Sequence, residues 1–378
     1  MQDKIFFSIL CLNEASDKMK SNKRIIGFDL ARAYAIFGMY IVNFNIVFGN
    51  YNDTSIAGKF LSLFSGNSST VFVMLAGMGM ALMTSRKVYT CEERRKLRST
   101  ISKRACFLLG LGLLLSLWWP ADILHFYGGY MLIAALLLFL DKKYYLYAAA
   151  IAVIVFHALL LIIPYETGWN LETLQYEGFW TINSFLRSTF YNGWNSIFPW
   201  LTYFTVGMYL GRLDWTLPKT QFRSFAIGLG LYLSVLLLQV IAGYLPLNEE
   251  IKLFINADYL PPFLPFVVST LGFGLMLIAF FMYIGKFLSE NSLAKNLAKT
   301  GQMTLTHYIA HLTVGMLILG VVTNREYTAK MNDKEPVHPL IIFGFATAYF
   351  VVSYYFSKLW AKRFKNGPFE MLMRKISD

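Results

Sequence analysis

A histidine follows an aspartate by three residues at the start of an apolar segment, in the run Asp122-Ile-Leu-His125. Residues three apart share a helix face, so the carboxylate can hold one imidazole nitrogen while the other nitrogen faces a cavity. A histidine held in this way suits general base catalysis near neutral pH. The alternative is a histidine at the membrane interface whose hydrogen bonds are simply satisfied. The spacing predicts His125 as a candidate base and Asp122 as its partner.

A second pair of histidines lies in the run Thr304-Leu-Thr306-His307-Tyr308-Ile-Ala-His311. His307 and His311 are four apart, and this spacing can hold a metal ion. No acidic residue follows nearby to complete a set of ligands, so we expect no metal. The two histidines then either bond neighbouring helices or line a reaction cavity, where either is the alternative base. Tyr308, between them, is a candidate to stabilise an oxyanion or to orient a thioester.

Polar groups inside an apolar segment are costly and therefore point to function. The first such segment contains Asp29 and Arg32, which are three apart and can pair. The pair either anchors the helix near the headgroups, or Arg32 binds an anionic group such as a nucleotide phosphate. Asn43 and Asn45 follow toward the outer side. They either bond neighbouring helices or contact a substrate.

Long apolar segments must position these side chains. The chain is 56% hydrophobic and 15% charged, whereas soluble domains are about 25% charged. Its apolar runs are continuous rather than alternating and approach the length that crosses a bilayer, which predicts helices rather than a barrel. We expect an all-α bundle of about ten transmembrane helices. Their approximate ranges are 26–48, 64–84, 104–119, 122–140, 145–163, 195–211, 223–243, 263–285, 302–322 and 339–361.

The net charge of +12 does not indicate nucleic acid, because most lysines and arginines fall in segments on one side of the predicted bundle. This positive-inside bias predicts that both termini are cytoplasmic. The expected organisation is a cytoplasmic segment (1–24), a single transmembrane domain (25–362) and a cytoplasmic tail (363–378). The irregular spacing of the three cysteines predicts neither a disulfide framework nor a metal site.

The longest outer loop, Tyr165–Trp194, is rich in aromatic residues and poor in charge. Such a loop is either an aromatic belt at the membrane interface or a platform on which a sugar stacks. We take Trp194 as a candidate substrate contact. The chain lacks a P-loop, a dinucleotide-binding fingerprint, HExxH and G-x-S-x-G, so the common soluble-enzyme motifs do not apply.

Six segments, in order along the chain, share a family pattern: Arg24–Asn43, Phe72–Leu82, Asp122–Gly128, Phe198–Arg212, Gly301–Tyr308 and Asn366–Arg374. Together they resemble the heparan-α-glucosaminide N-acetyltransferase-like and YeiB-like superfamily of transmembrane acyltransferases. The resemblance spans nearly the whole chain, with Ala33 where glycine is usual and His307 where asparagine is usual. The loop Gly49–Gly66 contains no histidine, although heparan acetyltransferase-like enzymes place a catalytic histidine there.

The resemblance implies transfer of an acyl group, expected to be acetyl, from cytoplasmic acyl-CoA to a hydroxyl or amine beyond the membrane. Acyl-CoA would be a co-substrate with no tightly bound cofactor. The expected acceptor is an envelope glycan or lipid-linked sugar. Arg32 and the basic segment Arg86–Arg104 are candidates for the CoA phosphates.

The expected location is the bacterial inner membrane, with the lipid bilayer as a partner, and a homo-oligomer is compatible with the sequence. Two other functions remain open. One is a proton-coupled transporter or flippase without chemistry, because buried histidine, aspartate and arginine can relay protons. The other is a non-catalytic membrane partner in an envelope complex.

Overall fold

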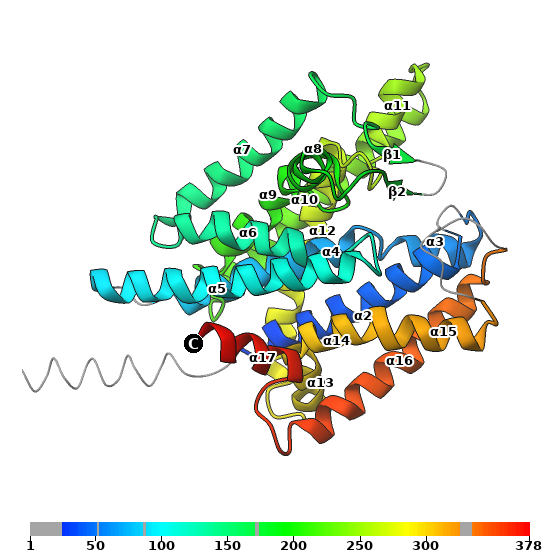
Figure 1. The fold of residues 1–378 in the computed structure, drawn as a ribbon. Helices are drawn as coiled ribbons and strands as arrows, with labels where there is room; N and C mark the ends of the chain where they lie inside the picture. Colours follow the sequence, from blue (N-terminus) through cyan, green and yellow to red (C-terminus); the bar gives the residue numbers. More distant parts are fainter. Residues whose placement is uncertain (1–24, 51–52, 86–87, 171–173, 326–334) are drawn as a thin grey trace, which may run out of the picture.

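The computed structural model describes residues 25–50, 53–85, 88–170, 174–325 and 335–378. These residues form a helical bundle with one two-residue strand pair, which confirms the predicted all-α membrane fold (Figure 1). The predicted cytoplasmic segment 1–24 lies outside the described residues, as do Arg86 and Lys87 of the predicted basic segment.

Every predicted transmembrane range coincides with an apolar helix. Within the described residues, eight helical segments are long and apolar enough to cross a membrane, and α6 and α9 are shorter apolar helices. The helices are α2 (Ile26–Phe48), α4 (Asn67–Met83), α5 (Cys91–Ser116), α6 (Leu124–Leu137), α7 (Lys142–Leu160), α9 (Ile197–Leu210), α10 (Pro218–Gly243), α12 (Leu264–Phe287), α14 (Thr304–Ala310) continued by the π-helical turn η2 (His311–Gly315) and α15 (Met316–Val322), and α16 (Pro339–Trp360).

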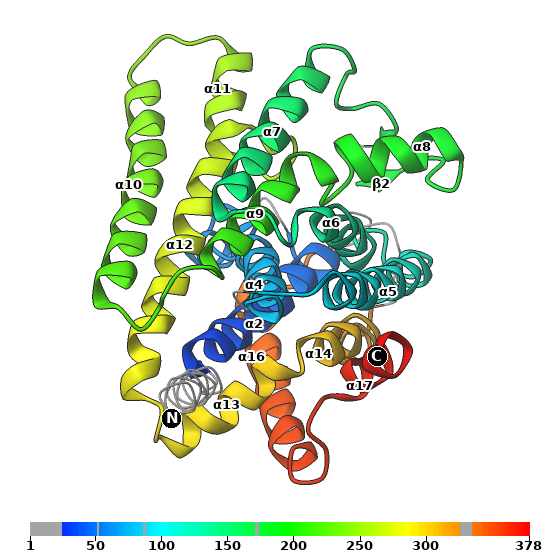
Figure 2. The same cartoon turned by 90° about the vertical axis from the view of Figure 1, so that its left-hand side faces the viewer.

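Shorter elements gather at the two ends of the bundle (Figures 1 and 2). We call one the α8 end; it carries α3 (Ile56–Ser62), β1 (Trp169–Asn170), β2 (Gln175–Tyr176), α8 (Ile182–Arg187), the π-helical turn η1 (Ser188–Asn192) and α11 (Glu249–Ile255). The opposite α17 end carries α13 (Ser292–Gln302), α17 (Pro368–Ser377) and the start of α2.

Helix α5 begins earlier than predicted, at Cys91 instead of residue 104. Thr90 and Glu93 form a capping box: the backbone N–H of Glu93 donates to Thr90 Oγ1 at 3.2 Å, and that of Thr90 donates to Glu93 Oε2 at 2.9 Å. Such a box satisfies backbone donors at a helix start. The predicted basic loop is therefore helical from Cys91 onward. Hydropathy located only the apolar part of the helix.

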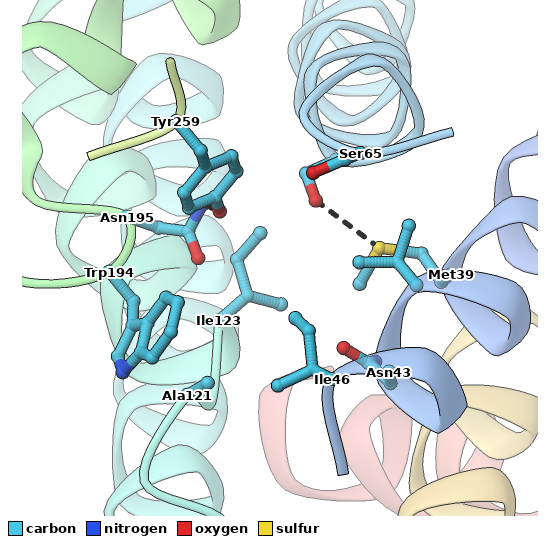
Figure 3. Close-up of a pocket in the computed structure, with 11 residues that line it drawn as sticks. Met39, Asn43, Ile46, Ser65, Ala121, Ile123, Trp194, Asn195 and Tyr259 are labelled. Atoms are coloured by element: carbon cyan, nitrogen blue, oxygen red, sulfur yellow. Dashed lines mark hydrogen bonds between the residues drawn. The ribbon is translucent and has the colours of Figure 1, made fainter. Parts of the chain in front are cut away.

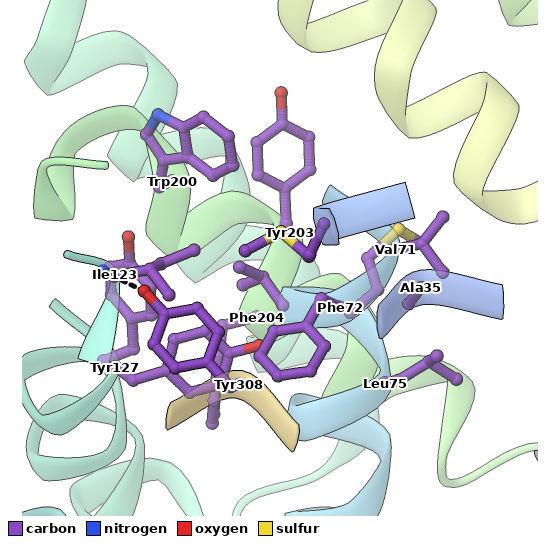
Figure 4. Close-up of a cluster of buried hydrophobic side chains, with 14 of the residues drawn as sticks. Ala35, Val71, Phe72, Leu75, Ile123, Tyr127, Trp200, Tyr203, Phe204 and Tyr308 are labelled. Atoms are coloured by element: carbon purple, nitrogen blue, oxygen red, sulfur yellow. Dashed lines mark hydrogen bonds between the residues drawn. The ribbon is translucent and has the colours of Figure 1, made fainter. Parts of the chain in front are cut away.

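Aromatic side chains fill the centre of the bundle where α4, α6, α9 and α14 meet (Figure 4). Phe72 and Tyr127 pack 5.4 Å apart between ring centroids, and Phe72 stacks 6.4 Å from Tyr308. Glycine lets the α4 and α9 backbones approach, because a Cβ on Gly77 would lie 2.0 Å from the Phe204 carbonyl oxygen. Tyr308 packs within this aromatic cluster and has no exposed surface.

Candidate functional site

Asp122 and His125 form a buried pair at the start of α6. They are 0% and 2% exposed. Asp122 Oδ2 accepts the backbone N–H of His125 at 3.0 Å and lies 3.2 Å from His125 Nδ1. A carboxylate can only accept, so Nδ1 carries a proton, and in the neutral imidazole Nε2 has the lone pair. Among the described residues, Nε2 is buried and has no hydrogen-bond partner. Both residues lie together as their spacing predicts, and the role of His125 as a base stays a prediction.

Tyr308 is a third member of this group. Its hydroxyl donates to Asp122 Oδ1 at 3.2 Å. The same hydroxyl accepts the backbone N–H of Ile123 at 3.2 Å (Figure 4). Asp122 therefore receives bonds from two helices, α6 and α14. This contact with the carboxylate was not foreseen in the sequence, where Tyr308 is a candidate oxyanion group.

A cavity of about 290 Å³ lies beside His125 at the α8 end. This volume is close to the lower limit of about 300 Å³ for small-molecule sites. The imidazole contacts Phe179 edge-on, with ring centroids 5.8 Å apart. The other lining residues include Ser116, Pro120, Phe126, Tyr176, Trp180 and Trp194. The aromatic loop thus covers the candidate base.

Asn192 holds this aromatic loop in shape. Its Nδ2 donates to the carbonyls of Tyr165 and Thr167 at 2.6 and 2.9 Å, and its Oδ1 accepts the Tyr176 hydroxyl at 2.7 Å. Arg187 Nε donates to the same hydroxyl at 2.8 Å. Burial raises the pKa of Tyr176 and Arg187 acts in the opposite direction. The phenol therefore stays neutral and links Asn192 to Arg187.

A second, smaller cavity of about 30 Å³ lies between α2 and the α5–α6 turn (Figure 3). It has room for roughly one water molecule. Asn43 lines one wall, and Ile123, Trp194 and Asn195 lie opposite (Figure 3). Trp194 lines both cavities. It therefore stands between the space beside Asn43 and the space beside His125.

His311 is already hydrogen-bonded through both ring nitrogens. Its Nδ1 lies 3.2 Å from the His307 carbonyl oxygen, and its Nε2 lies 2.8 Å from Asn43 Nδ2. A carbonyl only accepts, so Nδ1 carries the proton and Nε2 accepts from the amide. The lone pair that a base needs is thus occupied by Asn43. The bond joins α2 to the π-helical turn that begins at His311, a distortion that is frequent at functional sites.

His307 joins α14 to α16. Its Nε2 lies 2.7 Å from Ser357 Oγ, whose hydroxyl donates to the Ser353 carbonyl at 2.9 Å. The serine oxygen therefore accepts from Nε2. This geometry fits the interhelical alternative for His307. No group of three His, Cys, Asp or Glu side chains able to hold a metal occurs within the described ranges.

The polar residues at the start of α2 lie apart from the His125 cavity. Asp29 is buried, and its Oδ2 accepts Gln302 Nε2 at 3.0 Å. The Arg32 guanidinium carbon lies 4.2 Å from the Phe28 ring centre. At the other end of α2, Asn45 is buried, and its Oδ1 has no hydrogen-bond partner among the described residues.

Comparison with protein families divides the chain into two overlapping parts. The model described as heparan-alpha-glucosaminide N-acetyltransferase, catalytic, matches residues 24–239, which include Asn43, Asp122 and His125. The model described as a protein of unknown function (DUF418) matches residues 210–378, which include Tyr308. A search of curated proteins found no match. Because the first match covers more than half of the 378 residues, and the second is YeiB-like, the chain belongs to the heparan-α-glucosaminide N-acetyltransferase-like and YeiB-like family of membrane proteins.

Proposed function

We propose that this protein is a membrane-embedded acyltransferase that moves an acetyl group from cytoplasmic acetyl-CoA to a hydroxyl or amine of an envelope glycan or lipid-linked sugar. The observation that carries the proposal is the buried Nε2 of His125, without a hydrogen-bond partner among the described residues, in a residue that lines a cavity of about 290 Å³. The match to an acetyltransferase catalytic family supports this class of reaction.

The proposed chemistry uses His125 as base and then as acid. As the acceptor oxygen or nitrogen attacks the thioester carbonyl, Nε2 takes its proton. The tetrahedral intermediate collapses, the carbon–sulfur bond breaks, and the departing sulfur of CoA receives that proton from the imidazolium. Asp122 stabilises the imidazolium through Nδ1. Nδ1 keeps its proton throughout and donates it as a hydrogen bond to the Asp122 carboxylate.

The donor is proposed to enter from the α17 end. The positive-inside bias assigns this end to the cytoplasm. The start of α5 presents exposed basic side chains there, with Arg94 and Arg98 each 5.4 Å from the Phe139 ring centre. Arg32 on α2 is a further candidate for the donor phosphates, and its guanidinium carbon lies 4.2 Å from the Phe28 ring centre. These groups mark a route along which an anionic donor would be attracted.

Asn43 is the candidate to orient the thioester. One of the two hydrogens on its amide nitrogen goes to His311, and the second can bind a carbonyl oxygen. The small cavity beside Asn43 is separated from the His125 cavity by Trp194 and the turn that contains Ala121. Transfer would therefore require Trp194 to move, so that the donor carbonyl and the acceptor share one space beside His125.

The acceptor is proposed to bind against the aromatic loop. The cavity is lined by the aromatic residues Phe179, Trp180 and Trp194, and also by Tyr176 and Ser188, whose side chains carry hydroxyls. An apolar wall with few polar groups is the usual composition of a small-molecule site. A sugar presents both a C–H face and hydroxyls, and so fits such a wall.

Purified protein in detergent tests this proposal when acetyl-CoA and an amino sugar or alkyl glycoside are supplied. We expect release of free CoA that depends on the acceptor, together with an acetylated product. The proposal is overturned if the protein does not bind acetyl-CoA and releases no CoA. Acceptor uptake driven by a proton gradient in vesicles, without CoA release, would instead establish the transporter alternative.

A further inference from the structure

Helix α14 begins without a side-chain cap of its own. Its N-cap residue, Met303, makes no capping hydrogen bond. Instead, Glu370 of α17 supplies the acceptors: Oε1 accepts the backbone N–H groups of Leu305 and Thr306 at 2.8 and 3.3 Å. Oε2 accepts the Thr306 hydroxyl at 2.5 Å. The first N–H groups of a helix lack intrahelical partners, and a carboxylate there also interacts favourably with the helix dipole.

Helix α17 is itself fastened to α5. Arg104 Nε donates to Ser377 Oγ at 3.0 Å, and its Nη2 donates to Asp378 Oδ1 at 2.8 Å. Figure 2 shows α17 beside α14 and α5. Burial raises the pKa of the Glu370 carboxyl, while its bonds from Thr306 act in the opposite direction. Helix α17 therefore joins α5, whose start carries basic side chains, to α14, which carries Tyr308.

The capped turn leads directly to the candidate site. Thr306 is two residues before Tyr308, whose hydroxyl holds Asp122 and accepts the Ile123 N–H. A shift of the first turn of α14 would move this hydroxyl away from both groups. Since Asp122 orients His125, the imidazole would lose part of its support.

We propose that Glu370 is a positioning residue, which caps α14 across the bundle and so holds Tyr308 against Asp122. It does not touch the reacting atoms. The consequence for catalysis rests on the proposed function, whereas the consequence for the Tyr308 contact does not. Two independent readouts therefore apply.

Hydrogen exchange of the whole protein in detergent tests the positioning directly. In Glu370→Ala, we expect the amides of Leu305 and Thr306 to exchange about tenfold faster, because they lose a buried hydrogen-bond acceptor. We expect the amide of Ile123 to exchange faster as well. The Ile123 amide is the reporter because its partner is the Tyr308 hydroxyl. Tyr308→Phe should speed exchange at Ile123 and leave Leu305 unchanged.

Two further variants separate positioning from general loosening of α17. Asp378→Ala removes a contact between α17 and α5 without touching α14, and should leave exchange at Ile123 at the wild-type rate. Glu370→Gln keeps one carbonyl acceptor and should restore most of the protection at Leu305. Unchanged exchange at Ile123 in Glu370→Ala, or equal effects in Asp378→Ala, would overturn the proposal.

The catalytic readout is acetyl-CoA turnover. We expect Glu370→Ala to lower kcat about tenfold with little change in KM for acetyl-CoA, and Glu370→Gln to recover most of it. Faster exchange at Ile123 with unchanged kcat would overturn the link to catalysis. If wild-type protein releases no CoA, the proposed function fails, and the exchange measurement still decides whether Glu370 positions Tyr308.

Discussion

The Tyr308 hydroxyl lies 3.2 Å from Asp122 Oδ1 and thereby fixes the carboxylate that orients His125. Residues 186 positions apart in the chain are joined in this way. The bond links the part of the chain that matches the acetyltransferase family to the part that matches DUF418. The candidate site therefore needs both parts of the molecule.

Replacing Tyr308 by phenylalanine tests this bond. The variant keeps the ring packing but removes one donor to Asp122 and the acceptor of the Ile123 N–H. We expect kcat for CoA release to fall about tenfold, and the free energy of unfolding to fall by about 1–3 kcal/mol because a buried donor is left unsatisfied. Steady-state kinetics and thermal unfolding in detergent measure both. If Tyr308→Phe had the kcat of the wild type, Asp122 would not need this bond.

Gly112 on α5 provides a steric test of the Asp122–His125 pair. A Cβ at this position would lie 2.1 Å from the His125 backbone nitrogen and 2.6 Å from Asp122 Oδ2. Gly112→Ala should displace the pair, lower CoA release at least about tenfold and cost about 1–3 kcal/mol of stability by overpacking. Gly110→Ala is the matched control on the same helix, because its Cβ would have no neighbour within 4 Å. Equal turnover in the two variants would contradict the prediction.

The Asn43–His311 bond is predicted to stabilise the packing of α2 against α14 and η2. Removal of either partner leaves the other buried and unsatisfied, so each alanine variant should lose about 1–3 kcal/mol of unfolding free energy. The double variant should lose less than the sum, with a coupling of about 0.5–3 kcal/mol. Thermal unfolding of all four proteins in one detergent measures the cycle. Simple additivity would mean that the bond contributes nothing.

Trp180 is predicted to contact the acceptor. Its side chain lines the cavity and is 60% exposed. Trp180→Ala should raise KM for the acceptor while leaving kcat and KM for acetyl-CoA nearly unchanged, as expected when uniform binding is lost. Tyr244, exposed to 86% between α10 and α11, is the control. A Tyr244→Ala variant with the same rise in KM would show a general effect of losing surface aromatics.

The fold could be predicted further from the sequence than the site could. Continuous apolar runs identify the membrane helices because burial in lipid imposes both length and composition. The polar start of α5 was missed, since residues 91–103 carry no hydropathy signal and depend on the Thr90 capping box.

Within the site, local pairs were predicted and distant ones were not. Asp122 and His125 are three apart, so helical geometry alone brings them together. Asn43 with His311, and His307 with Ser357, depend on how separate helices pack, which no spacing reveals. Glu370 gave a weaker signal: it follows Gly367 and Pro368 in a segment that resembles the family, but its partner on α14 became visible only in the fold.

The most direct test of the account compares His125→Ala with His311→Ala. Both are buried histidines, but only His125 presents an Nε2 without a hydrogen-bond partner among the described residues, whereas Nε2 of His311 accepts from Asn43. The measurement is acceptor-dependent CoA release by purified protein, normalised to acetyl-CoA binding and to folded protein by chromatography. We expect His125→Ala to lower kcat by about 10²–10⁴-fold, and His311→Ala to lower stability with kcat within a few-fold of wild type. Wild-type turnover in His125→Ala, or loss of turnover in folded His311→Ala alone, would contradict this expectation.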